Sequence, residues 1–229
     1  MINILYIRLK KLLFSLFFCA LGLTSFGQNK TLNFTGMLVY KVTPHVPTDA
    51  RKGAQNTMTI FTNDTITRTE NYTRSFGKQV TIRHIELNKS YLLITISDTS
   101  KFAIQSNLNA EDSLEQESKY TFRTKIFKRN VLGMKAKRIK VNHPDFEEAI
   151  EFLYLKKYSN EYLNNFDEIP GLLVKYSIAT PNGILDYELV KLERYLPSQD
   201  LFGIPSDYER VSIDSFLEQM MDARKLNQE

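Results

Sequence analysis

Apolar and polar residues alternate along most of this chain, which is the pattern of β-strands that bury one face. In the clearest stretch, 119–127, Tyr120, Phe122 and Ile126 share one face, and Lys119 and Arg123 lie on the other. Similar runs occupy 32–43, 57–62, 65–70, 79–86, 90–97, 101–105, 133–141, 149–158, 172–180 and 184–196. We therefore predict a mainly β protein of about ten strands, and its 12 Tyr and 15 Phe favour strands as well.

Breaks in this pattern predict how the strands are connected. Asn182–Gly183 supplies the positive φ of a hairpin turn. In 133–141 the apolar phase slips by one residue, which predicts a bulge near Lys137–Arg138. The polar, acidic stretch 106–118 is a loop or short helix, either a lid or a solvated connection. After 212, apolar residues recur at helical spacing, and Ser212 suits the N-cap of a short C-terminal helix.

The first 27 residues have the pattern of an export signal. Arg8, Lys10 and Lys11 precede an apolar run at 12–23, and Ser25-Phe26-Gly27 fits a cleavage site. The run is short for a transmembrane helix, so a retained anchor is the weaker alternative. Phe18 argues against lipidation of Cys19, because lipoprotein signals place small residues before the cysteine. We expect residues 28–229 to form one β domain, soluble in the periplasm.

The composition of residues 28–229 argues against several classes of function. Without residues 1–27, the net charge falls from +4 to +1, so nucleic-acid binding is not expected. No cysteine remains, and the three histidines show no ligand spacing, so we expect no metal site and no cofactor. The chain has neither a G-x-S-x-G elbow nor a phosphate-binding glycine loop. We therefore predict that the protein is not an enzyme.

Charge is concentrated in one stretch, 119–143, which holds nine basic residues and no acidic one. One interpretation is a hairpin that contacts a membrane or a protein partner through Lys135, Lys137 and Arg138. The other is the solvated face of an antiparallel sheet whose neighbouring strands supply acidic residues.

Several short motifs carry a resemblance to a known family. The hexapeptide Glu-Ile-Pro-Gly-Leu-Leu at 168–173 is similar to the hallmark of the GLPGLI family of exported Bacteroidetes proteins. Pro170, Gly171 and Leu172 match that hallmark, whereas Glu168 replaces its first glycine. The stretches 36–40 and 130–136 resemble the opening and central strands of the family. The closing signature is matched at 201–208, with Phe202, Pro205 and Tyr208.

The resemblance implies a half-barrel of the LolA and LppX type, a strongly curved antiparallel sheet with an apolar concave face covered by helices or loops. It also implies a non-enzymatic binding or carrier module for a lipid or other apolar ligand. The alternative is an envelope protein that acts through protein–protein interaction or as a structural element. From the inward-facing positions we predict that the ligand would be lined by Tyr40, Tyr120, Phe122, Phe152, Tyr154 and Tyr176.

Overall fold

The computed structural model describes residues 33–45, 56–73, 77–107, 119–159, 166 and 168–226. The expected signal peptide, with Cys19, and nearly all of the expected lid lie outside these residues. The described residues form twelve strands, a short 3-10 helix and one α-helix. In chain order these are β1 (Thr35–Pro44), β2 (Asn56–Asn63), β3 (Ile66–Thr73), β4 (Gly77–His84), β5 (Lys89–Thr95), β6 (Lys101–Asn107), β7 (Thr121–Val131), β8 (Met134–Asn142), β9 (Ile150–Leu155), β10 (Leu172–Thr180), β11 (Gly183–Arg194), η2 (Gln199–Phe202), β12 (Glu209–Ser212) and α3 (Ile213–Leu226).

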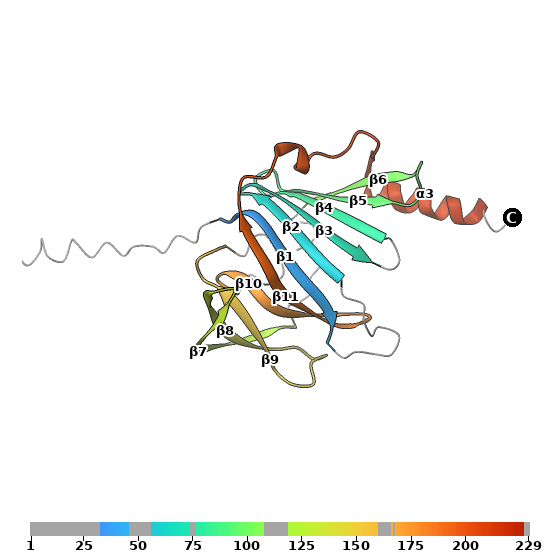
Figure 1. Ribbon diagram of the computed structural model, residues 1–229. Helices are drawn as coiled ribbons and strands as arrows, with labels where there is room; N and C mark the ends of the chain where they lie inside the picture. Colours follow the sequence, from blue (N-terminus) through green and yellow to red (C-terminus); the bar gives the residue numbers. More distant parts are fainter. Residues whose placement is uncertain are drawn as a thin grey trace, which may run out of the picture. The chain divides into compact units, whose positions relative to one another are not determined.

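All twelve strands belong to one sheet, in the order β12-β6-β5-β4-β3-β2-β1-β11-β10-β9-β8-β7 (Figure 1). β2 to β6 follow one another as antiparallel neighbours, and so do β7 to β11. The two series meet where β1 pairs with both β2 and β11. The edge strands β12 and β7 do not pair with each other, so the sheet is large, curved and unclosed. The predicted half-barrel class is confirmed.

The structure corrects two details of the prediction. β12 pairs with β6 in parallel, so the sheet is not wholly antiparallel. The four residues of β12 carry one apolar side chain, Val211, which is too short a pattern to recognise in the sequence. The predicted bulge lies opposite Lys137–Arg138 but on β7, where the register shifts between Lys125 and Lys128. β8 keeps a regular register with β9 through those residues.

The main core is built on β1, β2 and β8–β11, and it includes both faces of β9 and β10, where 152–155 and 172–174 are all buried. It contains residues from strands that are far apart in the sheet order, such as Ile60 of β2 and Ile139 of β8. They join one cluster because the sheet is curved, so part of the core lies on its concave face. The Tyr40 hydroxyl donates to the Leu173 carbonyl oxygen at 2.7 Å, linking β1 to β10 across β11.

The chain between β11 and β12 packs against the other half of the sheet. Ile204 and Tyr208 lie on a cluster formed by Val80, Ile82 and Leu93. α3 packs elsewhere, with the Phe216 ring 5.4 Å from the Phe102 ring of β6. Its predicted N-cap is confirmed, because the backbone N–H of Ser215 donates to Ser212 Oγ at 3.2 Å. No helix in the described part of the chain has the length and apolar character needed to cross a membrane.

A cluster of charged residues joins this connection to β3. Arg68 donates to Glu70 Oε1 at 2.7 Å and to the Leu201 carbonyl oxygen at 3.0 Å, and Lys78 Nζ lies 2.8 Å from Glu70 Oε2. Partial burial raises the pKa of the Glu70 carboxyl, but the hydrogen bonds from Lys78 and Arg68 outweigh it, so its pKa is lowered overall. Glu70 is therefore ionised at neutral pH and holds both cations.

This charged cluster should make part of the stability depend on pH. A carboxyl with a lowered folded pKa contributes stability above its unfolded pKa of about 4.3 and loses it as the pH falls through the folded value. We expect Glu70→Gln to lower the free energy of unfolding by up to ~1 kcal/mol at neutral pH, since the group is partly exposed. Urea titrations should show this difference shrinking below about pH 4. A difference that is constant across this range would contradict the assignment.

Candidate functional site

The concave face carries a continuous cluster of aromatic rings, which we call the aromatic cluster. Its members come from β1, β7, β9, β10, β11 and the chain just before β7 and β10. They are Tyr40, Tyr120, Phe122, Phe152, Phe166, Tyr176 and Tyr187. Tyr176 and Tyr187 are cross-strand partners whose rings stack 4.7 Å apart at an interplanar angle of 6°. Edge-to-face contacts join most of the others, the geometry that aromatic quadrupoles favour.

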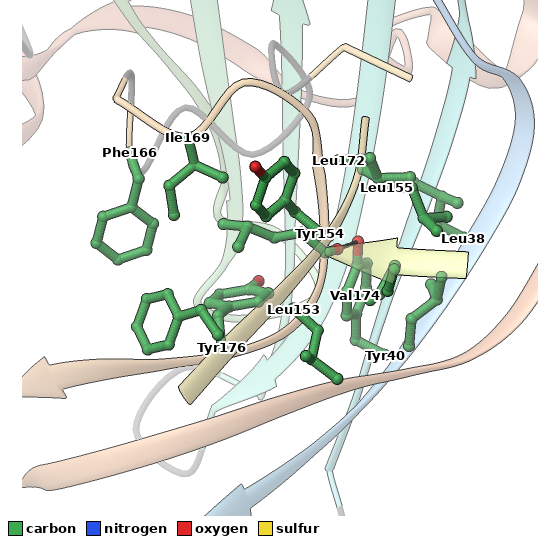
Figure 2. Packing of buried hydrophobic residues seen from close by; sticks show 14 of the residues in the cluster. Leu38, Tyr40, Leu153, Tyr154, Leu155, Phe166, Ile169, Leu172, Val174 and Tyr176 are labelled. Carbon is green, nitrogen blue, oxygen red and sulfur yellow. Dashed lines mark hydrogen bonds between the residues drawn. The ribbon is translucent and has the colours of Figure 1, made fainter. Parts of the chain in front are cut away.

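The structure brings five of the six predicted ligand-lining residues into this cluster. Tyr40, Phe152 and Tyr176 are fully buried, and the sixth, Tyr154, is buried in the same hydrophobic core (Figure 2). Tyr120 and Phe122 are only partly buried. Phe122 lies on β7 and Tyr120 lies just before it, and β7 is an edge strand of the sheet. The aromatic cluster therefore runs from the closed centre of the core to a free edge of the sheet. Its buried centre is occupied by the rings of Phe152, Phe166 and Tyr176, which contact one another.

Phe166 is the member that the sequence does not suggest. It precedes the motif at 168–173, in a polar stretch that predicts a loop or one helical turn. Its side chain is 3% exposed, and its ring lies 4.9 Å from Tyr120, 5.4 Å from Phe152 and 6.5 Å from Tyr176. Figure 2 shows Phe166 and Ile169 on the side of the core where Tyr176 lies. A single ring from the connection therefore fills the centre of the aromatic cluster.

The motif residues hold the chain on the C-terminal side of Phe166. The Ile169 N–H donates to the Phe166 carbonyl at 3.2 Å, the Gly171 N–H to the Ile169 carbonyl at 2.8 Å, and the Leu172 N–H to the Tyr158 carbonyl at 3.0 Å. Gly171 has a φ of 157°, and a Cβ there would lie 2.5 Å from the Leu155 carbonyl oxygen. Leu172 is buried and Pro170 exposed. The hexapeptide thus starts β10 against the end of β9 and positions Phe166.

The residues of the closing signature lie away from the aromatic cluster. Phe202 is buried and Pro205 is exposed. Tyr208 packs on the Val80 cluster, and its hydroxyl lies 3.0 Å from Thr95 Oγ1. These residues fasten the connection between β11 and β12 to the sheet.

Tyr176 has a buried hydroxyl that lacks a hydrogen-bond partner among the described residues. Burial, reinforced by the neighbouring Tyr40 and Tyr187, raises its pKa well above the usual range of tyrosine. The hydroxyl is therefore protonated at neutral pH and is a donor without an acceptor. Buried polar groups are normally paired, and an unpaired one costs stability. The sequence gives no sign of this, because a tyrosine in an alternating strand predicts only an inward side chain.

A separate open pocket lies beside the aromatic cluster. It has a volume of about 460 Å³ and is lined by His45, Asp145, Phe146, Glu147, Glu148, Ala149, Ile150 and Ile184. His45 Nδ1 lies 2.9 Å from a carboxylate oxygen of Asp186, and the same carboxylate accepts from Ser177 Oγ at 2.6 Å. The Phe146 ring is 5.9 Å from Tyr120, so the pocket and the aromatic cluster are neighbours. None of the six predicted residues lines this pocket.

The three basic residues predicted to contact a membrane or a partner lie on two different faces of the β7–β8 hairpin. Lys135 and Lys137 share one face of β8, and Arg138 lies on the other because side chains alternate along a strand. Arg138 donates through Nε to Glu151 of β9 at 2.6 Å. A neighbouring strand therefore neutralises Arg138, as the solvated-face interpretation expects. Within the described residues no ion pair involves Lys135 or Lys137.

The described residues contain no group of three or more histidine, cysteine, aspartate or glutamate side chains placed to hold a metal ion. What the fold and the aromatic cluster define is a mainly β protein with one curved, unclosed sheet and an aromatic interior.

Comparison with known proteins gives distant structural likenesses. No model of a known protein family matches the chain, and no curated protein matches its sequence. PNGF-II in space group P21 is similar with a TM-score of 0.49 and 15% identity over 82% of this chain, which spans 33% of that protein. An uncharacterized conserved protein from Thermus thermophilus has a TM-score of 0.48 and 11% identity, covering 81% of this chain and 93% of the other. The Mycobacterium tuberculosis lipoprotein LppX has a TM-score of 0.35 and 9% identity, covering 68% and 85%. These values are too low for the likenesses to indicate a function.

Proposed function

We propose that this chain is an exported, non-enzymatic binding or carrier module of the GLPGLI family, acting in the periplasm. Its ligand is an apolar molecule with one hydrogen-bond acceptor, such as a lipid acyl chain that ends in a carboxyl or ester group. The ligand takes the place of Phe166 in the aromatic cluster. The resemblance of the motif at 168–173 supports family membership, and the pattern of residues 1–27 supports export.

The unpaired hydroxyl of Tyr176 carries this proposal. It lies in an apolar, aromatic environment next to Phe166, at 6.5 Å between ring centroids. An acceptor on a ligand would satisfy this donor, and the apolar body would replace the Phe166 ring against Tyr120 and Phe152. Each buried methylene of such a ligand contributes about 0.8 kcal/mol.

The partial burial of Tyr120 and Phe122 gives the ligand a route into the aromatic cluster. These residues lie at the β7 edge of the sheet, and both contact Phe166. If the Phe166 side chain moved outward, the aromatic cluster would open towards this edge, because Phe166 contacts both residues there. The motif hydrogen bond between Leu172 and Tyr158 would keep the start of β10 in place meanwhile.

Native mass spectrometry and lipid extraction of the purified protein test the proposal directly. We expect a copurifying lipid, or saturable binding of a fluorescent fatty acid. The matched variant is Tyr176→Phe, which removes only the unpaired hydroxyl. It should leave the unfolding midpoint of the ligand-free protein unchanged or raised, yet weaken fatty-acid binding by about threefold to tenfold, the effect of one hydrogen bond.

Two results would contradict the proposal. One is the absence of both a copurifying lipid and fatty-acid binding. The other is a Tyr176→Phe protein that unfolds at a lower midpoint and binds the fatty acid as tightly as the parent, since the hydroxyl would then serve folding alone.

A further inference from the structure

The turn between β7 and β8 has an unusual residue at its tip. Leu132 and Gly133 have φ values of 48° and 75°, and Val131 and Met134 close the turn as cross-strand partners. Two-residue turns with positive φ at both positions favour Asn-Gly. A leucine in this conformation is disfavoured because its Cβ approaches the following carbonyl oxygen.

Leu132 differs from the other residues that adopt this backbone conformation. The other non-glycine residues with positive φ among the described residues are Asp64 and Asn88. Their side-chain types tolerate the left-handed region. Leu132 is therefore the exception, and the needs of the turn do not explain it.

Packing does not explain Leu132 either. Val131 and Met134 are partly buried and pack against the main core. Leu132 is 48% exposed and does not belong to any of the hydrophobic clusters of the described residues. An apolar side chain thus projects into water from the end of the hairpin, in a backbone conformation that destabilises it.

Basic side chains surround this tip, and we call them the basic collar. They are Lys128, Arg129, Lys135 and Lys137. Lys128 lies directly opposite Lys137, a cross-strand arrangement of like charges that is destabilising. Within the described residues no ion pair involves a member of the basic collar. The collar, like the turn, is therefore unfavourable for the isolated protein.

We propose that the tip of the β7–β8 hairpin is a reversible wedge for an anionic lipid surface. Leu132 enters the boundary between headgroups and acyl chains, and the basic collar contacts the anionic headgroups. Insertion removes Leu132 from water, and headgroup charges relieve the repulsion between Lys128 and Lys137. This inference is independent of the ligand site, because Leu132 is not part of the aromatic cluster.

The shape of the tip favours a lipid surface over an acidic protein. A specific protein interface buries on the order of 800 Å² on each partner. A two-residue turn with one projecting leucine offers little of that area. A bilayer needs only a small apolar insertion beside several basic side chains.

Vesicle sedimentation tests the wedge with the protein purified after export. Vesicles of phosphatidylcholine with about 30 mol% phosphatidylglycerol should bind the protein, and pure phosphatidylcholine vesicles should bind it much more weakly. Leu132→Asn should lower the partition coefficient by roughly tenfold, the effect of losing one buried leucine. The same variant should unfold at an equal or higher midpoint, because asparagine suits the turn.

Two further variants distinguish insertion of Leu132 from attraction by charge alone. Lys135→Glu with Lys137→Glu should weaken binding by about fivefold for each basic residue lost, and the new Glu opposite Lys128 keeps the hairpin paired. Leu87→Asn is the matched control, since Leu87 is 64% exposed and lies in the turn before β5, away from the collar. It should bind vesicles as the parent does.

Three outcomes would overturn the wedge. Parent-like binding by Leu132→Asn, with loss only in the charge variant, would show that charge alone attracts the protein to the vesicles and that Leu132 does not insert. An equal loss in Leu87→Asn would mean that any exposed leucine acts in this way. Equal binding to both kinds of vesicle would remove the role of the basic collar.

Discussion

Replacing Phe166 by alanine is expected to lower the free energy of unfolding by about 3–5 kcal/mol, as for other buried phenylalanines. The Phe166 ring contacts four aromatic side chains, so its loss leaves a cavity in the middle of the aromatic cluster. If this ring occupies the ligand site, the variant should also bind a fluorescent fatty acid more tightly than the parent does. Urea denaturation and fluorescence titration measure the two effects, which have opposite signs.

Phe34→Ala is the matched control for this experiment. Phe34 is 1% exposed, and its ring lies 5.4 Å from that of Tyr158, outside the aromatic cluster. A similar loss of stability is expected, with no gain in fatty-acid binding. If Phe166→Ala folds but binds the probe no better than Phe34→Ala does, Phe166 is an ordinary core residue and the ligand site lies elsewhere.

Replacing Gly171 by alanine is expected to cost at least about 3 kcal/mol, in the range reached by backbone strain at special positions. The added Cβ would lie 2.5 Å from the Leu155 carbonyl oxygen and 3.0 Å from Lys156 Cα. Both contacts are with the backbone, so a side-chain rotation cannot relieve them. The start of β10 would have to move away from β9, and the turn that positions Phe166 would move with it.

Gly133→Ala provides the comparison for Gly171→Ala. Gly133 has a φ of 75°, but a Cβ there would have no neighbour within 4 Å. The variant should therefore lose only about 1–2 kcal/mol, the cost of a left-handed alanine. Thermal or urea unfolding of both variants checks the difference. Equal losses would show that the close approach to Leu155 is not what requires glycine at 171.

The sequence predicted individual strands well because the apolar pattern of each strand lies within its own residues. In β10 every residue from Leu172 to Val174 is buried, and the predicted range agrees with the observed one. The N-cap at Ser212 and the hairpin after Thr180 depend on neighbouring residues only. The exceptions are β12, whose four residues give no periodic pattern, and the position of the bulge, which the pairing of β7 with β8 determines.

The candidate site was only partly predictable. Alternation placed Tyr40, Phe152 and Tyr176 on inward faces, and the structure buries all three. Alternation cannot say whether an inward face is hollow or filled, because that depends on what packs against it from elsewhere in the chain. The place of Phe166 and the unpaired Tyr176 hydroxyl emerge only from contacts between distant segments.

The sequence by itself determined a mainly β protein, the faces of its strands, the turn chemistry and the helix cap, since these follow from side-chain periodicity and local backbone preference. Only the tertiary structure decided that β1 joins β11, that the sheet curves around the aromatic cluster and that Phe166 fills its centre. Strand order and curvature depend on pairings between residues more than one hundred positions apart, such as Tyr40 with Leu189, and no local pattern encodes them. The same holds for Leu132, whose exposure and backbone strain appear only once the hairpin is formed.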